Sequence, residues 1–178
     1  MQTIREAAGS GQEMFWRQPQ ALRYEFELRA SDKALLATLR WQTALGSLAL
    51  AVTAEGRWIF QQTGFWRRAV TVRRADETAK VATFVPHWNG SGTLYLTAGR
   101  TLRWRPGDVW LSRWLWRDDS GAPLLTIGAK RGVLRLAAPV IIAPAAMDLP
   151  ELDILTTLGW YLLILRSRET VATTPAPV

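Results

Sequence analysis

The 178-residue sequence contains no cysteine, so it forms no disulfide bond and has no thiol nucleophile. His87 is its single histidine. Acid–base and nucleophilic sites need a second positioned group, which favours a structural or solvent-exposed role for His87. The sequence also lacks the glycine patterns of phosphate and dinucleotide sites, and the His or Cys clusters or spaced carboxylates of metal sites. We therefore predict a protein that is not an enzyme and holds no metal or cofactor.

Acidic residues are in short supply. The sequence has 15 Asp and Glu against 22 Lys and Arg, which gives a net charge of +7. Such an excess favours acidic partners, namely phospholipid headgroups, nucleic acid or acidic proteins. The alternative is ordinary charge for solubility. Apolar content is 48%, as in globular proteins, but ten tryptophans predict large buried rings or an adhesive surface.

Only one long apolar segment is present, at Asp148–Arg168. Its uncharged part is Ile154–Leu165, which is shorter than the roughly 20 apolar residues that a membrane-spanning helix needs. Acidic residues precede this part and arginines follow it. We therefore predict a buried core helix and a chain that does not span the membrane.

The sequence around this segment is typical of a capped helix. Asp148 is a suitable N-cap, Glu151 has capping-box spacing, and Pro150 falls in the first turn. Arg166 and Arg168 suit the negative pole of the helix dipole. Apolar side chains lie on every side of the helix axis, so the helix needs apolar neighbours in every direction.

The preceding residues alternate between apolar and polar side chains, as half-buried strands do. In the first such run Leu22, Tyr24, Phe26 and Leu28 share one face, and charged residues occupy the other. Turn residues separate the runs at intervals typical of an all-β sandwich or barrel. The predicted strands are 22–28, 34–42, 47–53, 58–60, 69–73, 80–85, 93–97, 100–105, 109–117, 123–128, 130–137 and 139–142.

A closed antiparallel sheet would surround the apolar helix and would leave no exposed sheet edge. We therefore predict a mainly β fold, a closed antiparallel β-barrel of about 12 strands around a central hydrophobic C-terminal helix at 148–168. The barrel domain is expected at 21–168, after an N-terminal leader at 1–20 and before a disordered tail at 169–178. The leader has no apolar core typical of a secretory signal, which favours the cytoplasm.

The predicted elements follow a recognisable order, in which paired strands precede the closing apolar segment 150–165. Turns join the paired strands at Glu55-Gly56-Arg57-Trp58, Ala98-Gly99-Arg100 and Asp118-Asp119-Ser120-Gly121. This order resembles the tubby C-terminal superfamily, which includes the plant LURP-one-related proteins and the phospholipid scramblases. The resemblance covers most of residues 21–168 and implies a barrel threaded by the last helix. No segment matches the tubby phosphoinositide pocket residue by residue, or the acidic calcium-binding segment of the scramblases.

Two basic stretches, 57–74 and 100–117, offer candidate ligand contacts. Forked guanidinium groups suit phosphate oxygens, and nearby aromatic rings could stack on bases or lie at a membrane interface. The alternative is that these arginines are simply the outward positions of strands whose inward positions are tryptophans. The candidate anion-binding residues are Arg67, Arg68, Arg73, Arg74, Arg103 and Arg105.

Two functions follow from these features. The first is a non-enzymatic binding module for phosphoinositide or other anionic lipid headgroups, cytoplasmic and peripheral to the membrane. The alternative is a structural or protein–protein interaction module with no small-molecule ligand, whose partner would be an acidic protein. Nucleic-acid binding is a weaker option because it needs a basic stripe on one face.

Overall fold

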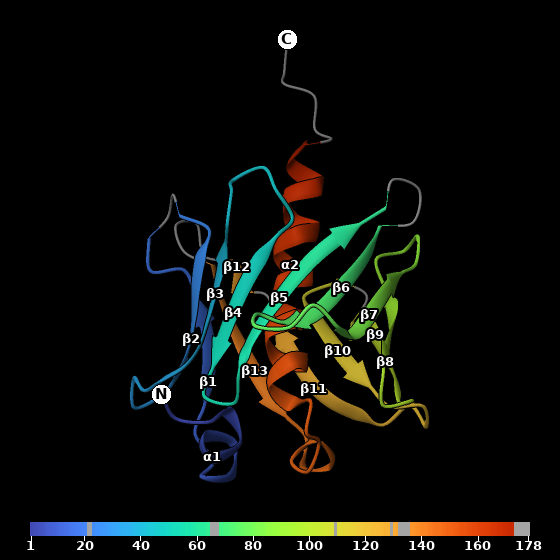
Figure 1. Cartoon of the computed structure of the whole chain (residues 1–178). Coiled ribbons are helices and arrows are strands. Elements are labelled where there is room, and N and C mark those ends of the chain that lie inside the picture. Colours follow the sequence, from blue (N-terminus) through green and yellow to red (C-terminus); the bar gives the residue numbers. More distant parts are fainter. Residues whose placement is uncertain (21–22, 65–67, 109, 129, 132–135, 173–178) are drawn as a thin grey trace.

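The computed structural model describes residues 1–20, 23–64, 68–108, 110–128, 130–131 and 136–172. In these parts of the chain one antiparallel sheet curves around a long helix (Figure 1). The elements are α1 (Ile4–Gly9), β1 (Met14–Arg17), β2 (Glu25–Ala30), β3 (Leu35–Trp41), β4 (Ala49–Thr53), β5 (Arg57–Thr63), β6 (Ala69–Arg74), β7 (Lys80–Pro86), β8 (Gly92–Leu96), β9 (Thr101–Pro106), β10 (Arg113–Arg117), β11 (Pro123–Gly128), β12 (Lys130–Arg131), β13 (Leu136–Ile142), the 3₁₀ helix η1 (Pro144–Ala146) and α2 (Leu152–Ala172).

The sheet closes on itself because its first strand pairs with its last. Met14 of β1 lies opposite Ala30 of β2 on one side and Val140 of β13 on the other. From β1 to β11 each strand pairs with the next, and β11 pairs with β13. Among the described residues, the short β12 pairs with the start of β13. The other 12 strands form a closed barrel, which confirms the predicted fold class.

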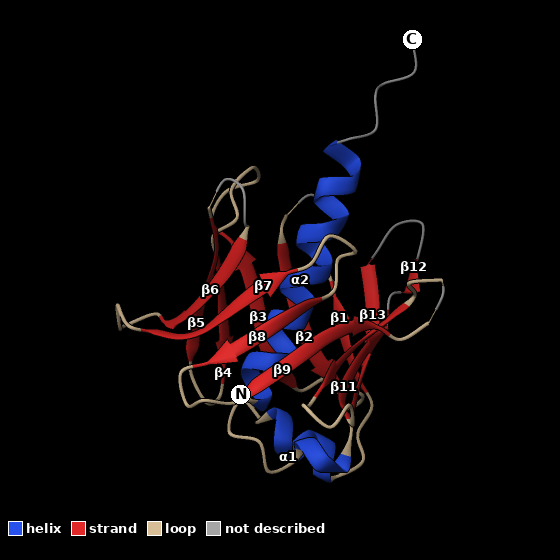
Figure 2. Cartoon of the chain, turned by 90° about the vertical axis from the view of Figure 1, so that its right-hand side faces the viewer, coloured by secondary structure: helices blue, strands red, loops and turns tan. Residues whose placement is uncertain are grey.

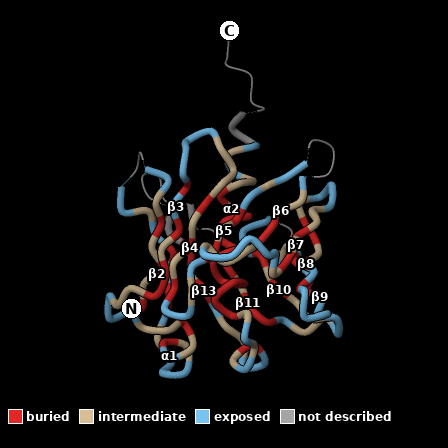
Figure 3. Tube along the Cα trace, viewed as in Figure 1, coloured by how far each residue is buried: buried red, intermediate tan, exposed pale blue. Residues whose placement is uncertain are grey.

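Alternation along each strand decides which side chains enter the barrel. In β2, Phe26 and Leu28 are buried, and in β10 the same is true of Trp114 and Trp116. Their neighbours along the strand point outward, as the period of two requires. Figure 3 shows buried residues in red along the strands and along α2.

α2 fills the interior of the barrel (Figure 2). Every residue from Leu152 to Leu162 is buried, which is about three turns of helix. The Nε1–H of Trp116 donates to the Leu155 carbonyl at 2.9 Å, and the Tyr161 hydroxyl donates to the Ser47 carbonyl at 2.6 Å. The predicted central helix is therefore confirmed.

Gly159 allows the wall to approach the helix closely. A Cβ at this position would lie 2.6 Å from Ile127 Cδ1 and 3.0 Å from Trp116 Nε1. The indole that bonds to the helix backbone therefore needs the space that glycine leaves.

The helix ends differ from the prediction. α2 begins at Leu152, and Asp148 lies in a turn before it instead of capping it. The Glu151 carboxylate does not close a capping box but accepts from Arg100 at 2.7 Å. At the other end the helix continues to Ala172, so residues 169–172 are helical where a disordered tail was predicted. Residues 173–178 lie outside the described part of the chain.

The predicted leader is part of the barrel domain. Thr3 and Glu6 form a capping box at the start of α1, and Ile4 and Ala7 of this helix are buried. Trp16 of β1 stacks on Trp160 of α2, with ring centroids 5.7 Å apart. The boundary predicted at residue 20 was wrong because the short segment 14–17 supplies the strand that closes the barrel.

The strand predicted at 109–117 is shorter than expected. β10 begins at Arg113, and Leu111 has a φ of 54°, a left-handed conformation that a strand does not contain. An extended strand over 109–117 would place Trp110 on the same face as Trp114 and Trp116. Trp110 instead lies in a turn, with an exposed fraction of 88%. Val109 lies outside the described residues.

A buried carboxylate links the start of α2 to the wall. Asp153 Oδ2 accepts from Trp58 Nε1 at 2.6 Å and from Thr53 Oγ1 at 3.0 Å. Nearby, desolvation and the negative charge of Asp153 raise the pKa of Glu55 above its usual value of 4.5. The fold therefore favours the neutral form of Glu55.

We expect Glu55→Gln to raise the free energy of unfolding at pH 7 and to leave it nearly unchanged at pH 4. A carboxyl whose pKa is raised by folding contributes most to the free energy of unfolding at pH values below its unfolded pKa. This contribution is lost as pH rises through the folded pKa. Urea unfolding at both pH values measures the difference. A variant that is equally stabilised at both pH values would contradict the assignment.

Candidate functional site

The two ends of the barrel differ in charge. Because successive strands are antiparallel, every second connection lies at the same end. The lower end, where α2 begins, carries Asp32, Glu55, Asp76, Glu77, Asp118 and Asp119 in its connections. At the upper end, where α2 leaves the barrel (Figure 1), lie the described residues of five connections: 18–20 and 23–24, 42–48, 64 and 68, 87–91, and 107–108 with 110–112. Arg23, Arg68, Arg166 and Arg168 lie at this upper end, with Asp108 and Glu169 as acidic residues there. The lower-end connections also contain the basic residues Lys33 and Arg100, but acidic residues outnumber them.

The structure does not bring the predicted arginines into one cluster. Arg68 lies at the upper end and pairs with Glu169 of α2 at 2.8 Å. Arg73 donates to the Arg74 and Glu77 carbonyls near the lower end of β6. The Arg74 guanidinium lies 4.8 Å from the centre of the Trp58 ring.

The other predicted arginines lie elsewhere. Arg103 and Arg105 are exposed outward positions of β9, and β7 and β8 separate this strand from β6. Arg67 lies outside the described residues. Of the predicted arginines that the structure describes, Arg68 is the one that lies in an upper-end connection and lines the cleft there.

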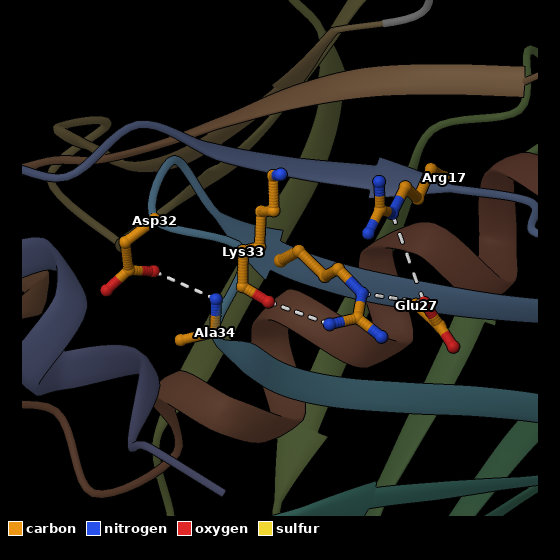
Figure 4. Close-up of polar contacts among 6 residues, drawn as sticks. Arg17, Glu27, Asp32, Lys33 and Ala34 are labelled. Atoms are coloured by element: carbon orange, nitrogen blue, oxygen red, sulfur yellow. Dashed lines mark hydrogen bonds and ion pairs between the residues drawn. The ribbon is translucent and has the colours of Figure 1, made fainter.

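Several other arginines are balanced by acidic residues on the outer wall. Arg29 of β2 pairs with Glu27 at 2.8 Å, and Arg17 of β1 lies 3.9 Å from the same carboxylate (Figure 4). In the turn after β2, the Ala34 N–H donates to Asp32 Oδ1, and Arg29 donates to the Lys33 carbonyl. These two arginines are outward positions of their strands and pair with an acidic residue on the same wall.

A cleft opens at the upper end between α2 and strands β5 to β10. Its volume is about 190 Å³. The inner part is apolar and is formed by Val70, Phe84, Trp104, Trp114 and Leu162. The rim is polar and is formed by Gln62, Arg68, His87, Arg166 and Glu169. An apolar pocket with a few polar groups at its mouth is the usual form of a small-ligand site.

Arg166 forms one side of this mouth. Its guanidinium lies 4.8 Å from the centre of the Trp114 ring, and Nη1 donates to the Asn89 carbonyl at 3.4 Å. Gly90 adopts φ +81°, and a Cβ there would lie 1.9 Å from Arg166 Nη1. Glycine therefore lets the 87–91 turn sit directly against the guanidinium.

His87 and Ser91 are 3.2 Å apart in the same turn. The Ser91 hydroxyl donates to Asn89 Oδ1 at 2.6 Å, so it must accept from His87 Nδ1–H. Ser91 is also buried. In this arrangement the imidazole does not accept the Ser91 proton, and the two residues stabilise the turn.

Arg168 fixes the opposite side of the upper end. Nη1 donates to the Gly46 carbonyl at 3.0 Å, and Nη2 donates to the Ala44 carbonyl. The guanidinium also lies 4.8 Å from the centre of the Tyr24 ring. Sequence reasoning assigned Arg166 and Arg168 to the helix dipole alone and missed their contacts with the loops, since these depend on where the barrel ends along α2.

Two broader searches used only the described residues. In that part of the chain no helix is long and apolar enough to cross a bilayer. The same residues include no group of three or more His, Asp or Glu side chains placed to hold a metal ion.

Comparison with known proteins gives a likeness of fold. No protein-family model and no curated protein matches the sequence. Among solved structures, the chain is similar to the X-ray structure of a protein from Arabidopsis thaliana, with a TM-score of 0.51 and 12% identity. The match covers 83% of this chain and 91% of that one. At this identity the likeness concerns the barrel architecture.

Proposed function

We propose that this chain is a non-enzymatic, cytoplasmic binding module for phosphoinositide or another anionic lipid headgroup, built on the barrel of the tubby-like and LURP-one-related proteins. The observation that supports this proposal best is the cleft at the upper end, where Arg68 and Arg166 lie at the mouth of an apolar pocket. An amphiphilic anion suits this combination because its acidic group meets guanidinium while its adjoining carbon atoms meet Trp114 and Phe84.

The ion pair at the mouth can be exchanged for a ligand. The side chains of Arg68 and Glu169 are 59% and 46% exposed, and exposed pairs contribute at most about 1 kcal/mol. A phosphate brings more charge than one carboxylate and matches the forked donors of arginine. A bound headgroup would therefore replace Glu169 as the partner of Arg68.

We expect the wild-type protein to bind vesicles of phosphatidylcholine with acidic lipid, and to bind less as salt rises. Arg68→Gln and Arg166→Gln should each weaken binding about fivefold, because an arginine near an anionic surface contributes about 1 kcal/mol. Cosedimentation with vesicles measures this. Arg103→Gln is the matched control, since it removes the same charge from an exposed outer-wall position.

Equal binding to neutral and acidic vesicles would contradict the proposal. So would an equal loss in Arg103→Gln, which would indicate a response to net charge alone. Because Arg166 also contacts Trp114 and Asn89, the urea midpoint of each variant must be compared with that of the wild type.

A second candidate is a protein-interaction module. It is favoured by an apolar groove of about 550 Å³ on the outer side of β1 and β13, where Phe15 and Ile141 are partly exposed. This groove is distant in the fold from the mouth formed by β5 to β10. A stoichiometric protein complex that Ile141→Ser disrupts, without any lipid binding, would establish this function instead.

A further inference from the structure

Three large apolar side chains at the upper end are almost fully exposed. Leu45, Trp88 and Trp110 have exposed fractions of 99%, 97% and 88%. They belong to three different connections, β3–β4, β7–β8 and β9–β10, all of which lie at the upper end because the strands alternate in direction. Exposed apolar groups gathered on one part of a surface usually mark an interaction site.

The turn that presents Leu45 is held in place. The Gly46 N–H donates to Thr43 Oγ1 at 3.0 Å, and Arg168 donates to the carbonyls on both sides of Leu45. The exposure of the leucine is therefore built into the turn.

The other two turns are held in similar ways. For Trp88, the His87 N–H donates to the Ser91 carbonyl at 2.8 Å, and the Gly90 N–H donates to the His87 carbonyl at 3.0 Å. For Trp110, Asp108 accepts from the N–H and hydroxyl of Ser112 at 2.8 Å and 2.5 Å. Hydrogen bonds between described residues on either side therefore flank both tryptophans.

The charges around these side chains indicate the partner. Arg23, Arg68, Arg166 and Arg168 lie at the same end and outnumber its acidic residues Asp108 and Glu169. The described connections of the lower end instead carry six acidic residues against Lys33 and Arg100. The field of such a molecule turns its upper end toward a negative surface. Tryptophan favours the water–hydrocarbon boundary of a bilayer, with arginines near the phosphates.

We propose that the upper end is a membrane-docking face, on which Leu45, Trp88 and Trp110 enter the interface of a bilayer that contains acidic lipid. α2 then points toward the membrane and the acidic lower end faces away from it. This inference rests on the proposed headgroup binding and adds the orientation of the barrel on the membrane. The cleft opens at the same end, so a headgroup reaches Arg68 and Arg166 without leaving the membrane surface.

Docking can be followed at single positions because the chain has no cysteine. Leu45→Cys and Thr78→Cys would each carry an environment-sensitive fluorophore, Thr78 being exposed in a lower-end connection. The probe is a vesicle of phosphatidylcholine and phosphatidylserine. We expect a blue shift and quenching by lipid-borne quenchers at residue 45 only. Equal shifts at both positions, or a shift at residue 78 alone, would overturn the docking face.

A second measurement separates docking from headgroup binding. Leu45→Ser combined with Trp110→Ser should lower vesicle affinity at least about tenfold, since two large apolar groups no longer leave water. Neither residue lines the cleft, so binding of monomeric short-chain phosphatidylserine should stay unchanged. Unchanged vesicle affinity in this variant overturns the docking face and leaves the proposed function standing. Failure of the wild type to bind either probe overturns both.

Discussion

Leu158→Asp is expected to leave the chain unfolded at room temperature. Leu158 is fully buried in the stretch of α2 where every residue from Leu152 to Leu162 is buried. The substitution loses the transfer free energy of a leucine side chain, about 2 kcal/mol, and places a carboxylate in the buried, largely apolar interior of the barrel. The sum is roughly 5 kcal/mol or more, which is comparable with the total stability of a typical domain.

Ser167→Asp is the matched control, because it introduces the same residue into the same helix at an exposed position. We expect it to change the urea midpoint little, since exposed substitutions usually stay within about 0.5 kcal/mol. Tryptophan fluorescence and near-ultraviolet circular dichroism report the loss of packing. A Leu158→Asp protein with a midpoint close to that of the wild type would show that the barrel does not enclose α2.

The barrel and its helix could be predicted because their signals are local. The alternation around Phe26 and Leu28 specifies an inward and an outward face, and Ile154–Leu165 is apolar on all sides. Neither signal depends on knowing which strands become neighbours. The closed sheet then followed as the simplest way to surround such a helix.

Features that depend on distant contacts could not be predicted in this way. β1 is only four residues long, and its partner β13 lies more than a hundred residues later. The capping-box pattern of Asp148 and Glu151 fits a helix start, but Arg100 from the β8–β9 connection takes the Glu151 carboxylate. In both cases a tertiary contact overrides the local pattern.

The arginine prediction grouped residues that are close in sequence, whereas the meander groups connections at one end. Arg73 and Arg103 belong to strands that two others separate, while Arg68, Arg166 and Arg168 lie at the same end because α2 leaves the barrel there. The sequence did contain a signal for the exposed apolar residues of the upper end. Leu45 and Trp88 are large apolar residues inside turn segments, which are usually polar, and neither is buried in the core.

Asp153→Ala is expected to lower the free energy of unfolding by about 3 to 5 kcal/mol, the usual cost of removing one partner from a buried charged contact. The Asp153 carboxylate accepts from Trp58 Nε1 and Thr53 Oγ1, and its own Oδ1 accepts from the Ile154 N–H at 2.8 Å. Truncation leaves these donors without their acceptor. The loss is costly because Asp153 is only 2% exposed, so water cannot replace the carboxylate. Urea unfolding at pH 7 measures the loss.

Trp58→Phe and the double variant complete a thermodynamic cycle. Because Trp58 and Asp153 share one hydrogen bond, the two losses should fall short of additivity by about 1 to 3 kcal/mol. Asp76→Ala, at an exposed lower-end position, is the control for loss of a carboxylate and should have little effect.

The Asp153→Ala variant also tests Glu55. Removing the charge of Asp153 removes one cause of the raised pKa of Glu55, so Glu55→Gln should stabilise this variant less than the wild type at pH 7. Additive losses together with an unchanged Glu55→Gln effect would mean that Asp153 does not join the start of α2 to the barrel wall.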